Sequence, residues 1–353
     1  MKKNYRIKDI AELSGVSTGT VDRILHKRGK VSTEAREKVE KVLKEIDYHP
    51  NLIARSLALK KQYHFITVTP IVHTGAYWEQ LCMGIEAAEN DLFSYNVKVR
   101  RLYFDQYDKN SFDELIPQIE NSDCQGVVIA TLFKEGVLNL TKVLDEKEIP
   151  YVLIDAYIEG THAVAYYGTP SFDSGYIAGR LIYNQLKAND DIVVFKFSRI
   201  GNQISTQVQI REEGFRTYLS EKNYQGRIHH VHIHAGDDGK NKEIVDEFMQ
   251  KYPEVNMGII FNSKAYLIGD YLENNETKKE FRLVGYDAID KNIHYLKNGR
   301  VTHLIAQRPE VQGLNCIKAL FRHLVLKEKN ELINHMPIDI LMKENIQYYN
   351  NYI

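Results

Sequence analysis

Residues 7–25 read IKDIAELSGVSTGTVDRIL, and this stretch decides how the N-terminal part of the chain folds. Apolar residues at helical spacing predict a first short helix, which Gly15 ends because a tight turn needs a residue that tolerates positive φ. Ser17 is a suitable N-cap for a second helix and Ser32 for a third. Three short helices with a tight turn between the first two are typical of a helix-turn-helix, whose second helix enters the major groove of DNA.

The outward face of the second predicted helix carries candidate contacts to DNA. Arg23 is the strongest candidate reader, since its fork matches the O6 and N7 acceptors of guanine; the alternative is a solvated charge. Asp22 either accepts a bond from cytosine N4, orients Arg23, or has a passive role. Three further residues share this face: Thr18, Gly19 and His26. Three others are placed to contact phosphates, which position the protein without reading sequence: Lys8, Ser17 and Lys30.

Charge is distributed unevenly along the chain. The 353 residues have a formal net charge of -1, but residues 1–61 carry a net charge of +7 and the remainder carries −8. A basic head on an acidic body suggests that only the head meets a polyanion such as DNA.

Beyond residue 62, strand-like and helical segments alternate. The expected strands cover residues 64–71, 97–104, 126–131, 151–155, 192–197, 228–234, 257–261 and 282–286. Continuous apolar runs such as residues 126–130 predict strands buried on both faces, which implies parallel sheets covered by helices. This many βα units favours an α/β fold with two doubly wound parallel-sheet lobes over one sheet. The expected organisation is a helix-turn-helix domain at 1–48, a connecting segment at 49–61 and a two-lobed domain at 62–353.

Ligands of doubly wound folds bind outside the carboxyl ends of the strands, and this rule selects candidate ligand contacts. Polar or aromatic residues at or near such positions are Tyr77, Trp78, Asp155, Arg211, Asn262, Asp287 and Gln307. Aromatic faces suit the C–H surface of a sugar ring, and carboxylates, amides and a guanidinium suit its hydroxyls. The alternatives are core packing for the two aromatic residues and helix-cap or loop contacts for the polar ones.

Several classes of site are not indicated. The cysteines Cys82, Cys124 and Cys316 are far apart, form no CxxC pair, and fit a reducing compartment. No signal peptide, membrane-spanning run or catalytic motif is recognisable. We therefore expect a cytoplasmic protein that is not an enzyme and needs no cofactor.

His230, His232 and His234 alternate along one expected strand and so share one face. Such a face can bind a metal, but no cysteine or acidic cluster accompanies it. A half-buried strand face or a subunit contact is the preferred interpretation, and we expect no metal site.

The head resembles that of the lactose-repressor (LacI-type) family, both in residues 7–25 and in residues 48–57, YHPNLIARSL. The family usually has Ser where this chain has Asp22, and a Thr or Ser cap where it has Arg6, which leaves the preferred half-site open. Almost all of residues 62–353 resembles the LacI-type effector domain and the periplasmic sugar-binding proteins. The seven candidate ligand contacts match effector-binding or sugar-binding positions of these relatives.

The resemblance implies that residues 49–61 form a hinge helix on operator DNA, in which Asn51, Arg55 and Leu57 contact the duplex. Leu57 matches a leucine that wedges into the minor groove; the alternative is an ordinary core leucine. The resemblance also implies a homodimer on a near-palindromic site and a sugar-like effector that controls operator affinity by allostery. Repression is the commoner role in the family, and activation is the alternative.

Two other classes of protein are consistent with parts of this sequence. A solute-binding protein that feeds a transporter would have the two lobes, but it would carry a signal peptide and lack the head. A sugar-acting enzyme with an accessory DNA-binding head would need an acid/base or phosphate-binding motif. The sequence favours the transcription regulator over both.

Overall fold

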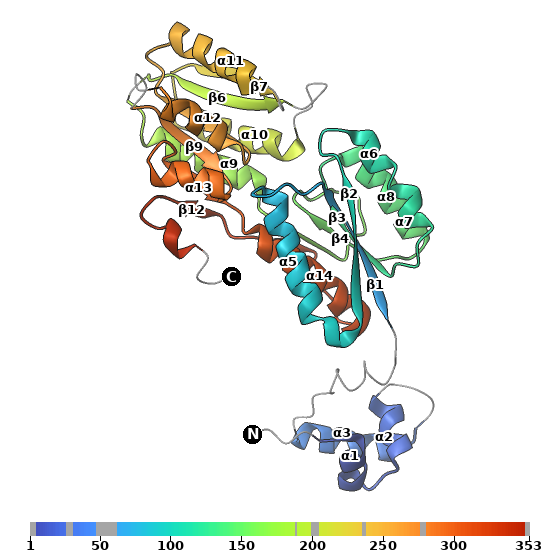
Figure 1. Cartoon of the computed structure of the whole chain (residues 1–353). Helices are drawn as coiled ribbons and strands as arrows, with labels where there is room; N and C mark the ends of the chain where they lie inside the picture. Colours follow the sequence, from blue (N-terminus) through green and yellow to red (C-terminus); the bar gives the residue numbers. More distant parts are fainter. Residues whose placement is uncertain are drawn as a thin grey trace. The chain divides into compact units, whose positions relative to one another are not determined.

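The computed structural model describes residues 5–25, 31–46, 62–187, 189–198, 205–234, 238–275 and 280–349 (Figure 1). The chain divides into two compact units, residues 1–59 and 60–353. The predicted connecting segment, residues 49–61, lies outside the described residues. Each unit is therefore considered by itself.

The first unit is a bundle of three helices: α1 (Ile7–Ser14), α2 (Thr18–Leu25) and α3 (Thr33–Glu45). Ile10, Val21 and Val39 come from the three helices and are fully buried together, because each helix presents one apolar stripe to the others. Gly15 ends α1 with φ +68°, and the Ser17 hydroxyl accepts a bond of 3.1 Å from the Thr20 N–H at the start of α2. The predicted turn and cap are confirmed.

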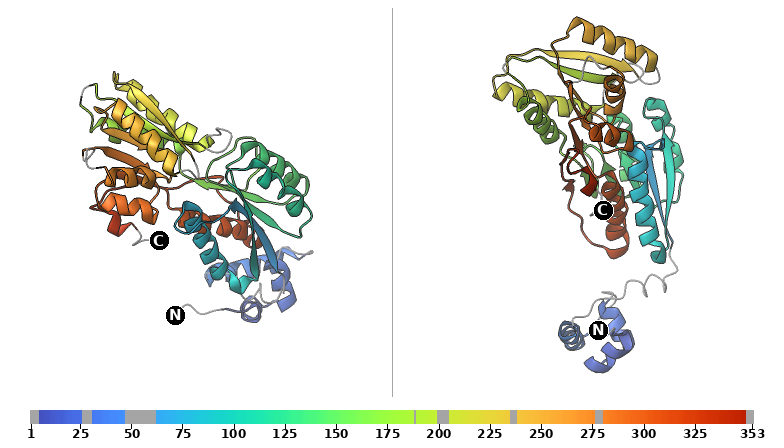
Figure 2. Two further views of the ribbon diagram at one scale, coloured as in Figure 1. Left: turned by 45° about the horizontal axis from the view of Figure 1, so that its top comes forward. Right: turned by 60° about the vertical axis from the view of Figure 1, so that its left-hand side comes forward.

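Lobe 1 of the second unit is a six-stranded sheet in the order β11-β5-β4-β3-β1-β2, with helices on both faces. Its strands are β1 (Tyr63–Pro70), β2 (Val97–Phe104), β3 (Gly126–Ala130), β4 (Tyr151–Ile154), β5 (Ala165–Gly168) and β11 (Ile333–His335). Helices α5 (Tyr77–Asp91) and α14 (Pro309–Phe321) lie side by side on one face (Figures 1 and 2). The other face is covered by α6 (Lys109–Asp113), α7 (Ile116–Glu120) and α8 (Lys134–Glu146).

Lobe 2 repeats this plan with the strand order β12-β10-β9-β8-β6-β7. Its strands are β6 (Ile192–Ser198), β7 (Ile228–His234), β8 (Met257–Ile260), β9 (Arg282–Tyr286), β10 (His303–Ala306) and β12 (Asp339–Leu341). Helices α9 (Ser171–Tyr183) and α10 (Thr206–Glu221) cover one face. Helices α11 (Asp238–Lys251), α12 (Ala265–Glu273) and α13 (Asp290–Lys297) cover the other. Short helical turns complete the two lobes at Phe93–Tyr95, Arg322–Leu326 and Ile346–Tyr348.

The chain passes between the lobes three times. It leaves lobe 1 after β5, returns after β10 to form α14 and β11, and crosses again to place β12 at the edge of lobe 2. Each lobe is thus built from separate stretches of chain. The carboxyl ends of strands from both sheets meet at one cavity between the lobes, as the doubly wound fold requires.

The predicted fold class is confirmed, with two additions. The expected helix near residues 112–119 is two short helices, and Pro117, which has no N–H to donate, lies in the first turn of the second one. Strands β5, β10, β11 and β12 were not predicted, and β12 pairs antiparallel with β10. The strands that were predicted differ from the structure by about a residue at their ends.

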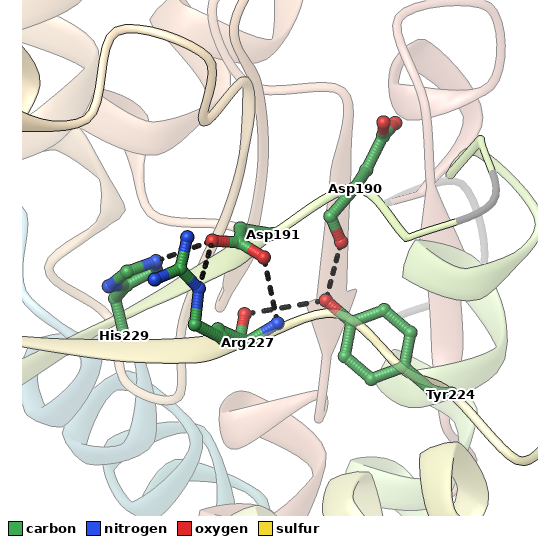
Figure 3. A network of polar contacts seen from close by, with 5 residues as sticks. All are labelled: Asp190, Asp191, Tyr224, Arg227 and His229. Carbon is green, nitrogen blue, oxygen red and sulfur yellow. Dashed lines mark hydrogen bonds and ion pairs between the residues drawn. The ribbon is translucent and has the colours of Figure 1, made fainter.

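One polar network joins the amino-terminal ends of β6 and β7 (Figure 3). The Asp191 carboxylate accepts bonds from the Arg227 backbone N–H at 2.8 Å and the Arg227 Nε at 3.1 Å. It also lies 2.9 Å from Nε2 of His229, while Tyr224 donates its hydroxyl to the Asp190 carbonyl. Burial raises the pKa of Asp191, but the bond from the Arg227 N–H, the His229 ring and the nearby positive charge outweigh it, so the pKa lies below its ordinary value.

We expect Asp191→Asn to lower the melting temperature at pH 7, because hydrogen bonds to a charged group contribute up to about 1.5–3 kcal/mol. The lowered pKa means that this stability is complete above the unfolded-state value near pH 4 and is lost as the pH falls through the folded-state value. The difference between wild type and variant should therefore shrink below about pH 4. Thermal unfolding of the full chain at several pH values, with Glu120→Gln as an exposed control, measures it. A difference that stays constant down to pH 3 would contradict this account.

Candidate functional site

The head presents its candidate DNA contacts on one exposed surface. Val21 and Ile24 turn one side of α2 into the core of the bundle, so Thr18, Gly19 and Arg23 are exposed on the other side. Asp22 is half-buried beside them. Lys8 on α1 and Ser17 before α2 are also exposed. His26, Lys30, Asn51, Arg55 and Leu57 lie outside the described residues.

The second unit contains a cavity of about 100 Å³ between the two lobes, which we call the interlobe cavity. All seven residues selected from the sequence line it: Tyr77, Trp78, Asp155, Arg211, Asn262, Asp287 and Gln307. Four of them follow strands directly or by one residue, after β4, β8, β9 and β10, which is why residues far apart in sequence meet here. Sequence reasoning missed Gln106, Gln207 and Lys264, which also line it, because a lone amide or lysine at a loop or helix start carries no distinguishing pattern.

Arg211 is the centre of the polar groups in this cavity. Its side chain is only 1% exposed and lies over the Tyr286 ring, with the guanidinium carbon 4.3 Å from the ring centroid. One terminal nitrogen donates to the Phe261 carbonyl at 2.8 Å, and the other donates to Oε1 of Gln307 at 2.8 Å. Its Nε has no hydrogen-bond partner among the described residues. A buried N–H without a partner is costly, which favours a ligand oxygen at this position.

Gln307 connects Arg211 to a buried carboxylate. Its Nε2 donates to Asp287 Oδ1 at 2.6 Å, and its backbone carbonyl accepts from the Gln312 side chain at 2.8 Å. Burial raises the pKa of Asp287, against the opposing effect of the Arg211 charge and the Gln307 amide. The carboxylate therefore gains from each further donor that reaches it, as a ligand hydroxyl would.

Asp155 holds the matching position in lobe 1. Its φ is +86°, and Asp287 has φ +67°, so both aspartates leave their strands in a conformation that a non-glycine residue seldom adopts. Gln207, on α10 of lobe 2, donates to Asp155 Oδ1 at 2.7 Å across the gap between the lobes. Gln80 on α5 reaches across in the other direction to the Ala288 carbonyl at 3.2 Å. These two amides join the lobes.

The two aromatic residues of the cavity, Tyr77 and Trp78, are buried. Tyr77 and Trp78 start α5, are 6% and 8% exposed, and meet edge to face with ring centroids 5.1 Å apart. Both belong to the core of lobe 1, which is the alternative drawn from the sequence, and both also line the interlobe cavity. Burial raises the pKa of Tyr77 well above its ordinary value, and the charges of Asp155 and Asp287 add to this, so the phenol stays a neutral donor.

The histidine strand does not form a metal site in the described part of the chain, where no group of three or more His, Cys, Asp or Glu side chains is arranged to hold an ion. His230 lies 2.7 Å from an Arg216 nitrogen and 3.9 Å from Glu212, which binds Lys196 instead. His229 points to the other face and packs on Phe248 and Tyr252. Helices long and apolar enough to cross a bilayer are likewise absent from the described ranges.

Comparison with known proteins gives the same organisation. Residues 66–329 match the family model of the periplasmic binding protein domain, and residues 6–51 match that of the lacI family of bacterial regulatory proteins. The ribose operon repressor of Lactococcus lactis is 24% identical over 343 residues, which cover 97% of this chain and 98% of the repressor. The sucrose operon repressor of Staphylococcus xylosus is 24% identical over 336 residues, 94% of this chain and 95% of that protein.

A solved structure from Bacteroides fragilis, assigned as a LacI transcriptional regulator, superposes with a TM-score of 0.77. It is 36% identical to this chain and covers 82% of it, while this chain covers 100% of that structure. The helix-turn-helix head, the two α/β lobes and these matches lead to one conclusion. The chain belongs to the LacI family of bacterial regulatory proteins and is a DNA-binding transcriptional regulator with a periplasmic-binding-protein-like effector domain.

Proposed function

We propose that this regulator binds a near-palindromic operator as a homodimer, and that a sugar or sugar-derived ligand in the interlobe cavity changes its affinity for that operator. The observation that supports ligand binding is the buried Arg211, which lines this cavity together with Asp155 and Asp287 and whose Nε has no partner among the described residues. Two aspartates and an aromatic wall beside it suit a ring that bears hydroxyl groups. Repression is the proposed role, and the cytoplasm, where operator DNA is accessible, is the proposed place of action.

The carboxylates in the cavity are proposed to bind and not to catalyse. Asp155 and Asp287 each accept a bond from a glutamine amide, at 2.7 Å and 2.6 Å, so both act as hydrogen-bond acceptors. A general acid and base would need a proton-transfer path to a bond that breaks. Turnover of a bound sugar in a product assay would support the enzyme alternative and contradict this proposal.

The DNA half of the proposal gives Arg23 the main role in reading bases, from its exposed position on α2. We expect Arg23→Ala to lower affinity for a selected operator roughly tenfold or more, since one bidentate contact to guanine contributes about 1–3 kcal/mol and a dimer makes two. Fluorescence anisotropy with operator and unrelated duplexes measures this. The matched control, Arg36→Ala on α3, removes the same charge and should lower the affinity for both duplexes alike. Equal operator binding by Arg23→Ala and the parent would show that Arg23 is not a reader.

The effector half predicts coupling between the cavity and the operator. Titration with monosaccharides, inositols and sugar phosphates should give a saturable fluorescence change of the single tryptophan, Trp78, for at least one ligand. That ligand should change operator affinity by roughly 5-fold to 150-fold, and the direction of the change distinguishes an inducer from a corepressor.

Arg211→Ala should abolish the fluorescence change and the coupling. Because Arg211 is buried, Asn262→Ala, at a half-buried position, provides a second variant with less risk to folding. A ligand that binds in the cavity without any effect on operator affinity would contradict the regulatory proposal.

For the dimer, we propose a surface on lobe 2. A cavity of about 820 Å³ lies between α11, α12 and α13, where Val245, Leu267 and Ile268 meet the rings of Tyr266 and Tyr271. An apolar hollow of this size on the protein surface is typical of an interaction site, and a second copy of the chain is the occupant that two-headed operator binding needs.

Leu267→Glu should therefore shift the protein toward monomer in analytical ultracentrifugation and weaken operator binding, since a buried carboxylate at an apolar contact is costly. Phe172→Glu on α9, at the opposite face of lobe 2, is the matched control and should leave the dimer intact. A Leu267→Glu protein that remains dimeric at micromolar concentration would place the interface elsewhere.

A further inference from the structure

The interlobe cavity continues into a second space of about 80 Å³, which we call the outer cavity. The two spaces share Gln106, Asn262 and Lys264 among their lining residues, so a ligand in the first can extend into the second. The outer cavity adds Tyr107, from the loop after β2, and Phe197, near the end of β6. It therefore lies between the lobes, as the interlobe cavity does.

The outer cavity differs from the interlobe cavity in charge. Asp155, Asp287, Arg211 and Lys264 all line the interlobe cavity, whereas the outer cavity is lined by Lys264 and by no carboxylate among the described residues. The outer cavity thus keeps a cation and lacks the acidic acceptors. A ligand that fits both spaces needs hydroxyl groups at one end and acceptor oxygens at the other.

Lys264 is half-buried and has only weak partners. Its Nζ lies 3.4 Å from the Tyr266 hydroxyl, 5.5 Å from the centroid of that ring and 5.7 Å from the centroid of Phe197. Within the described residues it forms no ion pair. Ring faces attract an ammonium group weakly, and an anion would satisfy its remaining N–H groups with stronger, charge-assisted bonds.

The neighbouring amide also offers donors. Asn262 Oδ1 accepts the Lys264 backbone N–H at 3.0 Å, so the oxygen of this side chain is already engaged and its NH₂ group is left for the cavity. The same bond fixes the loop from which Lys264 extends. The rings of Tyr107 and Phe197 lie 6.5 Å apart, one from each lobe, and add apolar surface to the outer cavity. Donors together with rings suit an anionic group attached to a carbon skeleton.

We propose that the outer cavity is a subsite for a negatively charged group of the effector, a carboxylate or a phosphate, on a sugar whose ring lies in the interlobe cavity. This inference rests on the proposed function and narrows its ligand to an acidic sugar. Lys264 is the residue that selects for the charge, with Asn262 as a neutral donor beside it. The Lys264 ammonium favours an anionic ligand over a neutral one. A neutral ligand hydroxyl beside it would leave its half-buried charge without a counterion.

The test compares matched sugars that differ in one group. The probes are D-glucose, D-glucuronate and D-glucose 6-phosphate, with the equivalent galactose set, followed by Trp78 fluorescence and by calorimetry on the full chain. We expect the sugar acid or the sugar phosphate to bind more tightly than the neutral parent sugar. Comparing the acid with the phosphate shows which of the two anionic groups the outer cavity prefers. Lys264→Gln should lower the affinity for that anionic ligand roughly tenfold to a hundredfold and change the affinity for the neutral sugar by less than about twofold.

Two further variants isolate the charge of Lys264. Lys264→Arg keeps the charge and should retain most of the affinity for the anionic ligand. Lys251→Gln removes the same charge from an exposed lysine of lobe 2 that lies over the Tyr252 ring, 5.4 Å from its centroid, away from both cavities. It should leave ligand binding unchanged, which distinguishes a specific contact from a general effect of net charge.

The outcomes distinguish a failure of the anionic subsite from a failure of the sugar site. One outcome is that the protein binds neutral sugars more tightly than their acid and phosphate forms, and that Arg211→Ala abolishes this binding. The sugar site would then be supported and the anionic subsite would be wrong. If an anionic sugar binds equally well to Lys264→Gln, the subsite is also wrong. If no member of either set binds to protein that melts cooperatively, the result counts against the sugar site and the anionic subsite together.

Discussion

The buried charge of Arg211 is the constraint on which the effector domain depends. A guanidinium that is 1% exposed must have its N–H groups satisfied, and lobe 2 supplies the partners from three adjacent strands. The Phe261 carbonyl follows β8, the Tyr286 ring ends β9 and Gln307 follows β10, so these strand ends must stay in register for the charge to be tolerated. The Nε is left without a partner among the described residues, and Arg211 lines the interlobe cavity.

The two lobes meet through amides, and the crossovers limit how the lobes can move. Gln207 bonds to Asp155 and Gln80 bonds to the Ala288 carbonyl, both across the gap. Arg308, in the second crossover, is held at φ +52° while its guanidinium forms two bonds of 2.7 Å and 3.2 Å with Asp339, just after the third. Because Arg308 directly follows Gln307, the second crossover begins next to the residue that bonds to both Arg211 and Asp287.

The sequence predicts the fold and the residues that line the interlobe cavity because both depend on local patterns. Apolar runs identify buried strands, and the residues that follow them, such as Asp155 and Asp287, converge because the strands are parallel. β11 and β12 escape prediction because their residues are half-exposed and each pairs with a strand from a distant part of the chain. Gln207 and Lys264 escape because their roles arise from contacts across the cavity: nothing in the sequence near residue 207 indicates an acceptor at Asp155.

Under the proposed function, a ligand in the interlobe cavity would act on the Gln207–Asp155 bond, which joins the two lobes. A ligand hydroxyl that donates to Asp155 competes with an amide that already holds the lobes together, so the net gain in hydrogen bonding is small. The free energy that favours the liganded state then comes from groups that have weak partners or none without it, namely Arg211 Nε and the Lys264 ammonium. Both extend from lobe 2, and the acceptor Asp155 belongs to lobe 1, so a ligand that satisfies all three must bridge the lobes. A ligand with differential affinity for one lobe angle shifts the equilibrium toward that angle, which is the physical requirement for allosteric control of a DNA-binding head.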